Sequence, residues 1–207
     1  MKRLKFILLA LALPLFAIAQ NPEATADAVL LSFLSKIDNQ TLSADFTITV
    51  SDDATAPISY NGKLQMHGEK FRISMLGNEG AYDGKTYYLY SEENNELTLS
   101  IPTRAELLEV NPVLFARELQ RGSTVRFSQT NKDSKRYVIE LVPNNRDTEI
   151  RKFVIKLKKV TLTPEEITVN EVAGPTTIVR FSNTQYSGRV PSFAITPQPG
   201  TFINDMR

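Results

Sequence analysis

The sequence predicts a mainly β protein with two helices, built on one meandering antiparallel sheet of about eleven strands. Two observations predict this fold class. After residue 41 the chain reads as short strands about ten residues apart, separated by turn residues. One amphipathic segment precedes these strands and a shorter one interrupts them. A large sheet with one apolar face tends to curl. Either it closes on its own side chains, or an apolar hollow remains under the helices as a ligand site.

The first residues, MKRLKFILLALALPLFAIAQ, have the pattern of a secretory signal peptide. Lys2, Arg3 and Lys5 precede an apolar run, and small residues Ala17 and Ala19 follow it. We expect cleavage after Ala19, which leaves residues 20–207 as a single domain. Because the chain contains no cysteine that could be lipidated, we expect the mature protein to be released into the periplasm.

Charge and composition narrow the range of functions. Removing residues 1–19 leaves 21 basic and 23 acidic residues, from 24 and 23 in the whole chain. Such a balance argues against a nucleic-acid partner, which requires a basic face. Without cysteine there are no disulfides, so stability has to come from the core and the sheet. We expect a monomer.

The amphipathic segment is predicted to form a helix over residues 24–39. Its apolar side chains follow one another at intervals of three and four, as on one helix face. They are Ala26, Val29, Leu30, Phe33, Leu34 and Ile37. A second helix is predicted at 111–122, with Asn111 as N-cap, Pro112 in the first turn and Gly122 at the end. Its few apolar residues, which include Leu114 and Phe115, can cover only a small opening.

Strand signals surround the second helix. In 42–50, residues such as Phe46 and Ile48 alternate with polar ones, and the Asp83-Gly84 pair is a strong hairpin signal. In TYYLY, Tyr88 and Tyr90 fall on one strand face and Tyr87 on the other. Five more strands are predicted after the second helix, at about 124–130, 136–142, 150–158, 165–172 and 175–183. The proline-rich tail is predicted to be irregular, with one edge strand.

Catalytic chemistry is not evident in the sequence. Histidine occurs once, at His67, and no nucleophile elbow, phosphate-binding glycine loop or dinucleotide fingerprint is present. The carboxylate pairs, such as Glu165-Glu166, lie in or beside predicted turns, which favours a solvated role. We therefore predict a protein that is not an enzyme and that has no metal or cofactor.

The order of LSADFTITV, NGKLQMHGEKFRISM, YDGKTYYLYSEENNELTL, a short NPVLF helix, YVIELVP and FAITPQPGTFIND resembles the LolA family of periplasmic lipoprotein carriers over essentially the whole mature chain. The resemblance implies an incomplete, half-open antiparallel β-barrel of about eleven strands with a helical lid. It implies a carrier that receives acylated lipoproteins from an inner-membrane ABC transporter and delivers them to an outer-membrane acceptor or to the outer membrane itself.

The resemblance also implies which residues act. An acyl-chain cavity and its lid would comprise Val29, Leu30, Phe33, Leu34, Ile37, Phe46, Ile48, Tyr88, Tyr90, Leu114 and Phe115. Arg72 occupies the position of a family arginine that holds the lid closed. Alternation with Phe71 and Ile73 places Arg72 on the outer face, whereas the latch role requires it to face inward, which we slightly favour. The alternative function is a non-catalytic periplasmic sensor module that binds lipid or peptide on the same fold.

Overall fold

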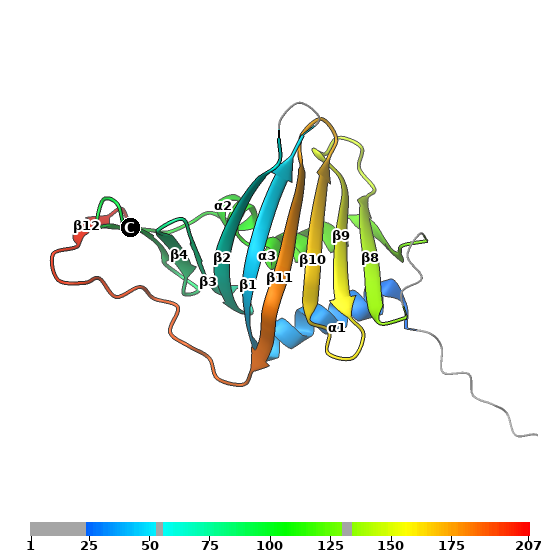
Figure 1. Cartoon of the computed structure of the whole chain (residues 1–207), viewed down its shortest axis with the longest axis horizontal. Coiled ribbons are helices and arrows are strands. Elements are labelled where there is room, and N and C mark those ends of the chain that lie inside the picture. Colours follow the sequence, from blue (N-terminus) through cyan, green and yellow to red (C-terminus); the bar gives the residue numbers. More distant parts are fainter. Residues whose placement is uncertain (1–23, 53–55, 130–133) are drawn as a thin grey trace, which may run out of the picture.

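A single twelve-stranded sheet dominates the computed structural model, which describes residues 24–52, 56–129 and 134–207 (Figure 1). The predicted signal peptide, residues 1–19, lies outside these ranges. The sheet order is β12-β6-β5-β4-β3-β2-β1-β11-β10-β9-β8-β7. All the pairings are antiparallel except that of β12 with β6. The predicted class, a half-open and mainly antiparallel barrel, is therefore confirmed.

The strands have the following bounds: β1 Thr41–Ser51, β2 Ile58–His67, β3 Lys70–Met75, β4 Asn78–Tyr82, β5 Tyr87–Ser91, β6 Glu96–Ser100, β7 Ser123–Phe127, β8 Arg136–Pro143, β9 Ile150–Lys158, β10 Pro164–Glu171, β11 Thr176–Ser187 and β12 Phe202–Asp205. The sequence predicted about eleven strands and an edge strand in the tail. That edge strand is β12, which returns to pair with β6.

Both predicted helices are confirmed, and their caps explain their boundaries. α1 (Ala26–Asn39) begins where the Thr25 side chain accepts a hydrogen bond from Ala28 N. α3 (Pro112–Arg121) begins at Asn111, whose side chain accepts from the backbone N–H groups of Val113 and Leu114. None of the helices in the described ranges is long and apolar enough to cross a membrane.

The sequence prediction missed a third helix, α2 (Arg104–Val110). It is seven residues long and has a capping box, in which Thr103 and Glu106 satisfy each other's backbone N–H groups. The pattern Thr-x-x-Glu was visible in the sequence. Only one residue of α2, Leu107, is buried, so the apolar periodicity that identifies longer helices is missing.

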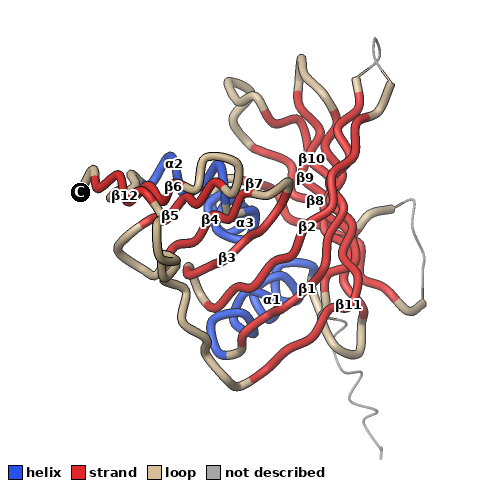
Figure 2. Tube along the Cα trace, turned by 60° about the vertical axis from the view of Figure 1, so that its left-hand side comes forward, coloured by secondary structure: helices blue, strands red, loops and turns tan. Residues whose placement is uncertain are grey.

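The sheet bends around the three helices, which gives it an inner and an outer face (Figure 2). Alternation places Phe46, Leu64 and Phe71 on the inner face, where they join the main core with α1. The Phe46 side chain and the backbone of β3 lie close to Gly62 on β2. A Cβ atom at Gly62 would lie 2.3 Å from Phe46 Cζ and 2.5 Å from the Ser74 carbonyl oxygen. Only glycine fits at this position.

Candidate functional site: an apolar cavity

A cavity of about 640 Å³ lies between the inner face of the sheet and helices α2 and α3. Its volume is within the range of small-molecule binding sites. Its walls come from β1, β2, β3, β5, β9, β10, β11 and the two helices. The lining residues are Phe46, Ile48, Leu64, Ile73, Met75, Tyr87, Leu108, Glu109, Val110, Pro112, Phe115, Ile150, Phe153, Ile167, Val169, Glu171, Thr177, Val179 and Phe181.

The lining is apolar and contains few groups that could fix the orientation of a ligand. Glu109 and Glu171 are the only carboxylates among the lining residues. Tyr87 contributes a hydroxyl, and burial raises its pKa, so this side chain stays neutral. Within the described ranges, no three His, Asp or Glu side chains gather as metal ligands. The cavity can therefore hold an apolar ligand by burial, and its polar groups impose little chemical selectivity.

Helices α2 and α3 form the cover of the cavity. Leu108 and Val110 of α2 and Phe115 of α3 face the hollow. Phe115 also packs against Phe153 of β9, with ring centroids 5.6 Å apart. Between the helices, Asn111 is buried, and its amide donates to the Glu69 carbonyl oxygen at 3.3 Å. This contact fixes the joint between α2 and α3 to the turn that links β2 and β3.

Charged side chains on the outside hold the cover in place. Arg104 of α2 pairs with Glu69 at 2.9 Å and with Glu118 of α3 at 3.2 Å. Arg104 therefore ties α2 both to the sheet and to the neighbouring helix.

Helix α3 is tied to α1 by a second set of polar contacts. Arg117 forms a two-pronged pair with Asp38, at 2.8 and 3.1 Å. Gln120 donates to Asp27 at 2.8 Å. Helix α3 is thus tied to α1 at two points. Within the described ranges, helix α2 makes no such polar contact with α1, and Leu107 is its one buried residue.

The predicted lid residues of α1 are together, but they do not line the cavity. Val29, Leu30, Phe33, Leu34 and Ile37 are all at most 5% exposed. They pack in the main core, with α1 against β1, β2, β7 and β8. α1 therefore belongs to the main core and closes one end of the half-barrel. Leu114 lies in the same core, because it is on the face of α3 that points away from the hollow.

The sheet residues of the predicted site divide between the two faces. Phe46, Ile48 and Phe115 line the cavity. The prediction that Tyr88 and Tyr90 line it is wrong. The register pairs Tyr88 with Ala81 and Leu99 on the outer face, where both tyrosines pack in a second, smaller cluster. Tyr87, the ring on the opposite side of the same strand, lines the cavity instead.

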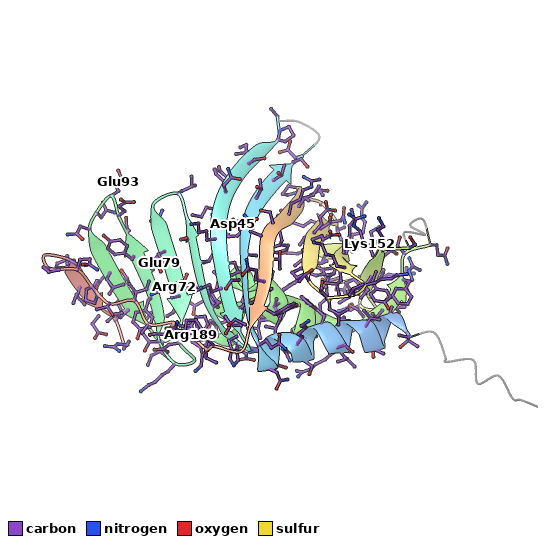
Figure 3. The ribbon with its side chains drawn as sticks, turned by 60° about the horizontal axis from the view of Figure 1, so that its bottom comes forward. Asp45, Arg72, Glu79, Glu93, Lys152 and Arg189 are labelled. Atoms are coloured by element: carbon purple, nitrogen blue, oxygen red, sulfur yellow. The ribbon has the colours of Figure 1, made fainter. Side chains whose placement is uncertain are left out.

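Arg72 also lies on the outer face, so the slight preference for an inward position is wrong. Phe71 and Ile73 on either side point inward, and alternation along β3 sends Arg72 outward. Its guanidinium pairs with Glu79 at 2.7 Å and donates to the Ala194 carbonyl oxygen at 3.0 Å. These partners lie on β4 and in the C-terminal segment, and neither belongs to the helical cover (Figure 3).

Sequence reasoning missed the contribution of β9, β10 and β11 to the cavity. Phe153, Val169 and Val179 line it, and each sits at an alternating apolar position of a strand that was itself predicted. The periodic signal was therefore present. What the sequence did not show is which of the many apolar positions would meet across the bend of the sheet.

The fold and the cavity define a lidded half-barrel, a class of binding protein with an apolar hollow between sheet and helices. The chain belongs to the family described as outer membrane lipoprotein carrier protein LolA, whose model matches residues 15–173. No curated protein shows significant sequence similarity to it.

Solved structures resemble this chain at low sequence identity. An uncharacterized conserved protein from Thermus thermophilus matches with a TM-score of 0.56 and 11% identity, covering 85% of this chain and 96% of that one. A LolA superfamily protein from Nitrosomonas europaea matches with a TM-score of 0.42 and 11% identity, covering 83% and 98%. The complex of MucA and MucB from Pseudomonas aeruginosa matches with a TM-score of 0.48 and 14% identity, covering 80% and 58%.

Proposed function

We propose that this protein is a periplasmic carrier that binds the acyl chains of lipoproteins in the cavity and moves them from the inner to the outer membrane. The observation that carries the proposal is the apolar cavity of about 640 Å³ under α2 and α3. Membership of the lipoprotein carrier family supports the choice of ligand. An inner-membrane ABC transporter would be the donor, and an outer-membrane acceptor or the membrane itself the recipient. The proposed role is non-catalytic.

Burial of the acyl chain provides the binding free energy. Each methylene withdrawn from water contributes about 0.8 kcal/mol, so a whole chain gains more than ~10 kcal/mol before the costs of opening and ordering. At that affinity, release would be slow. A cover whose closed state is itself stabilised competes with the ligand and lowers its net affinity.

Helix α2 is the element suited to open the cavity. Leu108 and Val110 would part from the strands, and the exposed pairs of Arg104 with Glu69 and Glu118 would break. The buried Asn111 is the fixed point of this movement. In this proposal, Arg104 takes the latch role that the family resemblance suggested for Arg72.

The experiment that tests acyl binding uses two neighbouring positions of β11. Val179→Lys places a charge in the cavity, whereas Ile178→Lys places the same charge on the outer face. Binding of cis-parinaric acid, a fluorescent fatty acid, is measured for both variants. We expect Val179→Lys to abolish binding, because an unpaired charge in an apolar cavity is costly, and Ile178→Lys to leave it intact. Equal binding by both variants would exclude the cavity as the site.

A second experiment tests the cargo itself. Protein purified from the periplasm is analysed by native mass spectrometry and by fatty-acid extraction. We expect bound triacylated lipoprotein in the native protein and none in Val179→Lys. Recovery of free lipid or of an unacylated peptide, with no lipoprotein, would favour the sensor module.

A further inference from the structure

The outer face of β7–β11, which we name the basic face, carries charged side chains of both signs. Alternation sends Phe153 and Val169 into the cavity and places six cations and three carboxylates on this side. The cations are Arg126, Arg136, Lys152, Lys156, Lys158 and Arg180, and the carboxylates are Glu140, Glu165 and Glu166. The helices in the described ranges lie on the other side of the sheet, as Figures 1 and 2 show, so they leave this face uncovered.

The cations and the carboxylates of the basic face lie at different depths. The six cationic side chains are 35% to 58% exposed, whereas the three carboxylate side chains are 11% to 23% exposed. Each carboxylate has two cationic partners: Arg126 and Lys152 for Glu140, Arg136 and Lys158 for Glu165, and Lys156 and Arg180 for Glu166. The surrounding water therefore meets mainly the positive members of these groups.

The basic face also differs in net charge from the rest of the chain. Its six cations and three carboxylates give it a net charge of +3. Residues 20–207 contain 21 basic and 23 acidic residues, so the rest of this range is net negative. Positive charge is thus concentrated on one side of the molecule, which would orient it toward a negatively charged partner.

The side chains between the cations are unlike the centre of a protein–protein interface. Such centres are poor in charged residues and contain aromatic anchors. The aromatic side chains of β7–β11 all belong to the main core on the inner side: Phe127, Tyr137, Phe153, Phe181 and Tyr186. Between its charges the basic face carries β-branched residues such as Val138, Val154 and Ile178. A face of dispersed cations without an aromatic anchor fits the array of phosphates on a bilayer surface.

An apolar side chain projects at the rim of the basic face. Val160, in the turn that joins β9 and β10, is 96% exposed, and Lys158 and Lys159 directly precede it. The turn is attached to the body of the protein, because Lys36 Nζ of α1 donates to the Thr161 carbonyl oxygen at 2.7 Å. An apolar tip beside lysines can enter the headgroup layer of a bilayer while the lysines pair with phosphates.

We propose that the basic face, with Val160 at its rim, docks this protein on a bilayer that contains anionic phospholipids. The inference goes beyond the proposed function and rests on it only for its purpose, since a carrier has to meet membranes. In this orientation α2 and α3 lie on the side away from the bilayer. The cover of the cavity then stays accessible to the transporter that would supply the cargo.

Vesicle co-sedimentation at low ionic strength tests the docking. The vesicles contain equal parts of phosphatidylglycerol and phosphatidylcholine, and vesicles of phosphatidylcholine alone are the neutral reference. The face variant combines Arg126→Gln, Lys158→Gln and Arg180→Gln, so that each carboxylate keeps one cationic partner. The control variant makes the same change in net charge at exposed positions outside the basic face, with Lys70→Gln, Lys85→Gln and Arg207→Gln.

We expect the face variant to lose most of its affinity for the anionic vesicles. Each Lys or Arg at an anionic surface changes the partition coefficient about fivefold, so the loss should be about 100-fold, and the control variant should lose about fivefold or less. Added salt should weaken the binding of the unchanged protein. Val160→Ser should weaken it further at high salt, whereas Val172→Ser, at a valine that is 48% exposed in the turn between β10 and β11, should not.

Equal vesicle affinity of the face and control variants would overturn the proposal. Loss of binding to immobilised polyglutamate, with vesicle binding unchanged, would also overturn it, because this result assigns the basic face to an acidic protein. Binding of cis-parinaric acid by both variants verifies that they are folded. If the face variant does not fold, Lys158→Gln alone should lower vesicle affinity about fivefold relative to Lys70→Gln, and equal affinities would overturn the docking. Vesicle docking by a protein that binds no acyl ligand would overturn only the carrier.

Discussion

Loss of the Arg104 latch is expected to make acyl binding faster and tighter. Arg104 makes two ion pairs, with Glu69 and Glu118, and the three side chains are 41% to 48% exposed. Exposed pairs contribute about 0.2–1 kcal/mol each, so Arg104→Ala should weaken the closed position of α2 by about 1 kcal/mol. Such a change shifts the equilibrium between closed and open forms about fivefold. If the closed form dominates, the apparent affinity for acyl ligands rises by the same factor.

The assay is stopped-flow fluorescence with cis-parinaric acid at low ionic strength. Arg180→Ala is the matched control, because Arg180 of β11 pairs with Glu166 of β10 and shares no carboxylate with Arg104. Raising the salt concentration should reduce the difference between Arg104→Ala and the unchanged protein, since salt screens exposed pairs. An association rate and affinity equal to those of the control, or lower, would refute the assignment of Arg104 as the latch.

Three predictions concern stability. Gly62→Ala should lower the free energy of unfolding by about 2 kcal/mol or more, because the new Cβ meets Phe46 and the Ser74 carbonyl oxygen. The control Gly188→Ala, whose Cβ would have nothing within 4 Å, should be tolerated. Equal urea midpoints for the two variants would contradict this prediction. Leu76→Asn should raise the midpoint of thermal unfolding, because Leu76 has a φ of 55° and asparagine adopts this conformation with about 1 kcal/mol less conformational free energy. An unchanged midpoint would count against strain at this turn. Stability should fall as the pH drops below about 4, because the pKa values of Glu140 and Glu166 are lowered in the folded state. Burial alone would raise both pKa values. Ser128, Lys152 and Arg126 outweigh burial at Glu140, and Lys156 and Arg180 outweigh it at Glu166. Since these carboxylates are more acidic in the folded state, they stabilise it above their unfolded pKa and cease to do so as they are protonated. In Glu140→Gln combined with Glu166→Gln, that part of the acid sensitivity should disappear, as measured by urea unfolding between pH 3 and 7.

The carboxylate pair Glu165-Glu166 shows how far local reasoning extends. The sequence indicated a solvated role near a turn, and the structure places both side chains at the start of β10 on the outer face. Glu166 lies between Lys156 and Arg180, and Glu165 pairs with Arg136 and Lys158. The charged partners come from β8, β9 and β11. Strict alternation would put the adjacent residues Glu165 and Glu166 on opposite faces, but a register shift between Pro164 and Glu166 lets both meet charged partners on one face.

Local sequence patterns determined the secondary structure of this protein. Helix caps, turn residues, the helical spacing of three and four residues and the strand alternation of two all act between neighbours in the chain. They therefore allowed α1, α3 and most strands to be predicted. The same patterns place Phe46 and Ile48 on one face of β1, together with Leu64 and Ile73 at equivalent positions of β2 and β3. The short α2 was missed because its single buried residue leaves no periodic signal.

Only the tertiary structure decided which face of each strand borders the cavity and what covers it. Alternation separates Tyr87 from Tyr88 and Arg72 from Phe71, but it does not say which side of the sheet will be concave. That choice depends on the packing of α1 against distant strands and on the contact of the C-terminal segment with Arg72 on the outer face. These contacts join residues far apart in the chain, and their free energies depend on the assembled fold. The sequence alone therefore defined the sheet and its two faces, and the long-range packing assigned the inner face to the cavity and the outer face to Arg72.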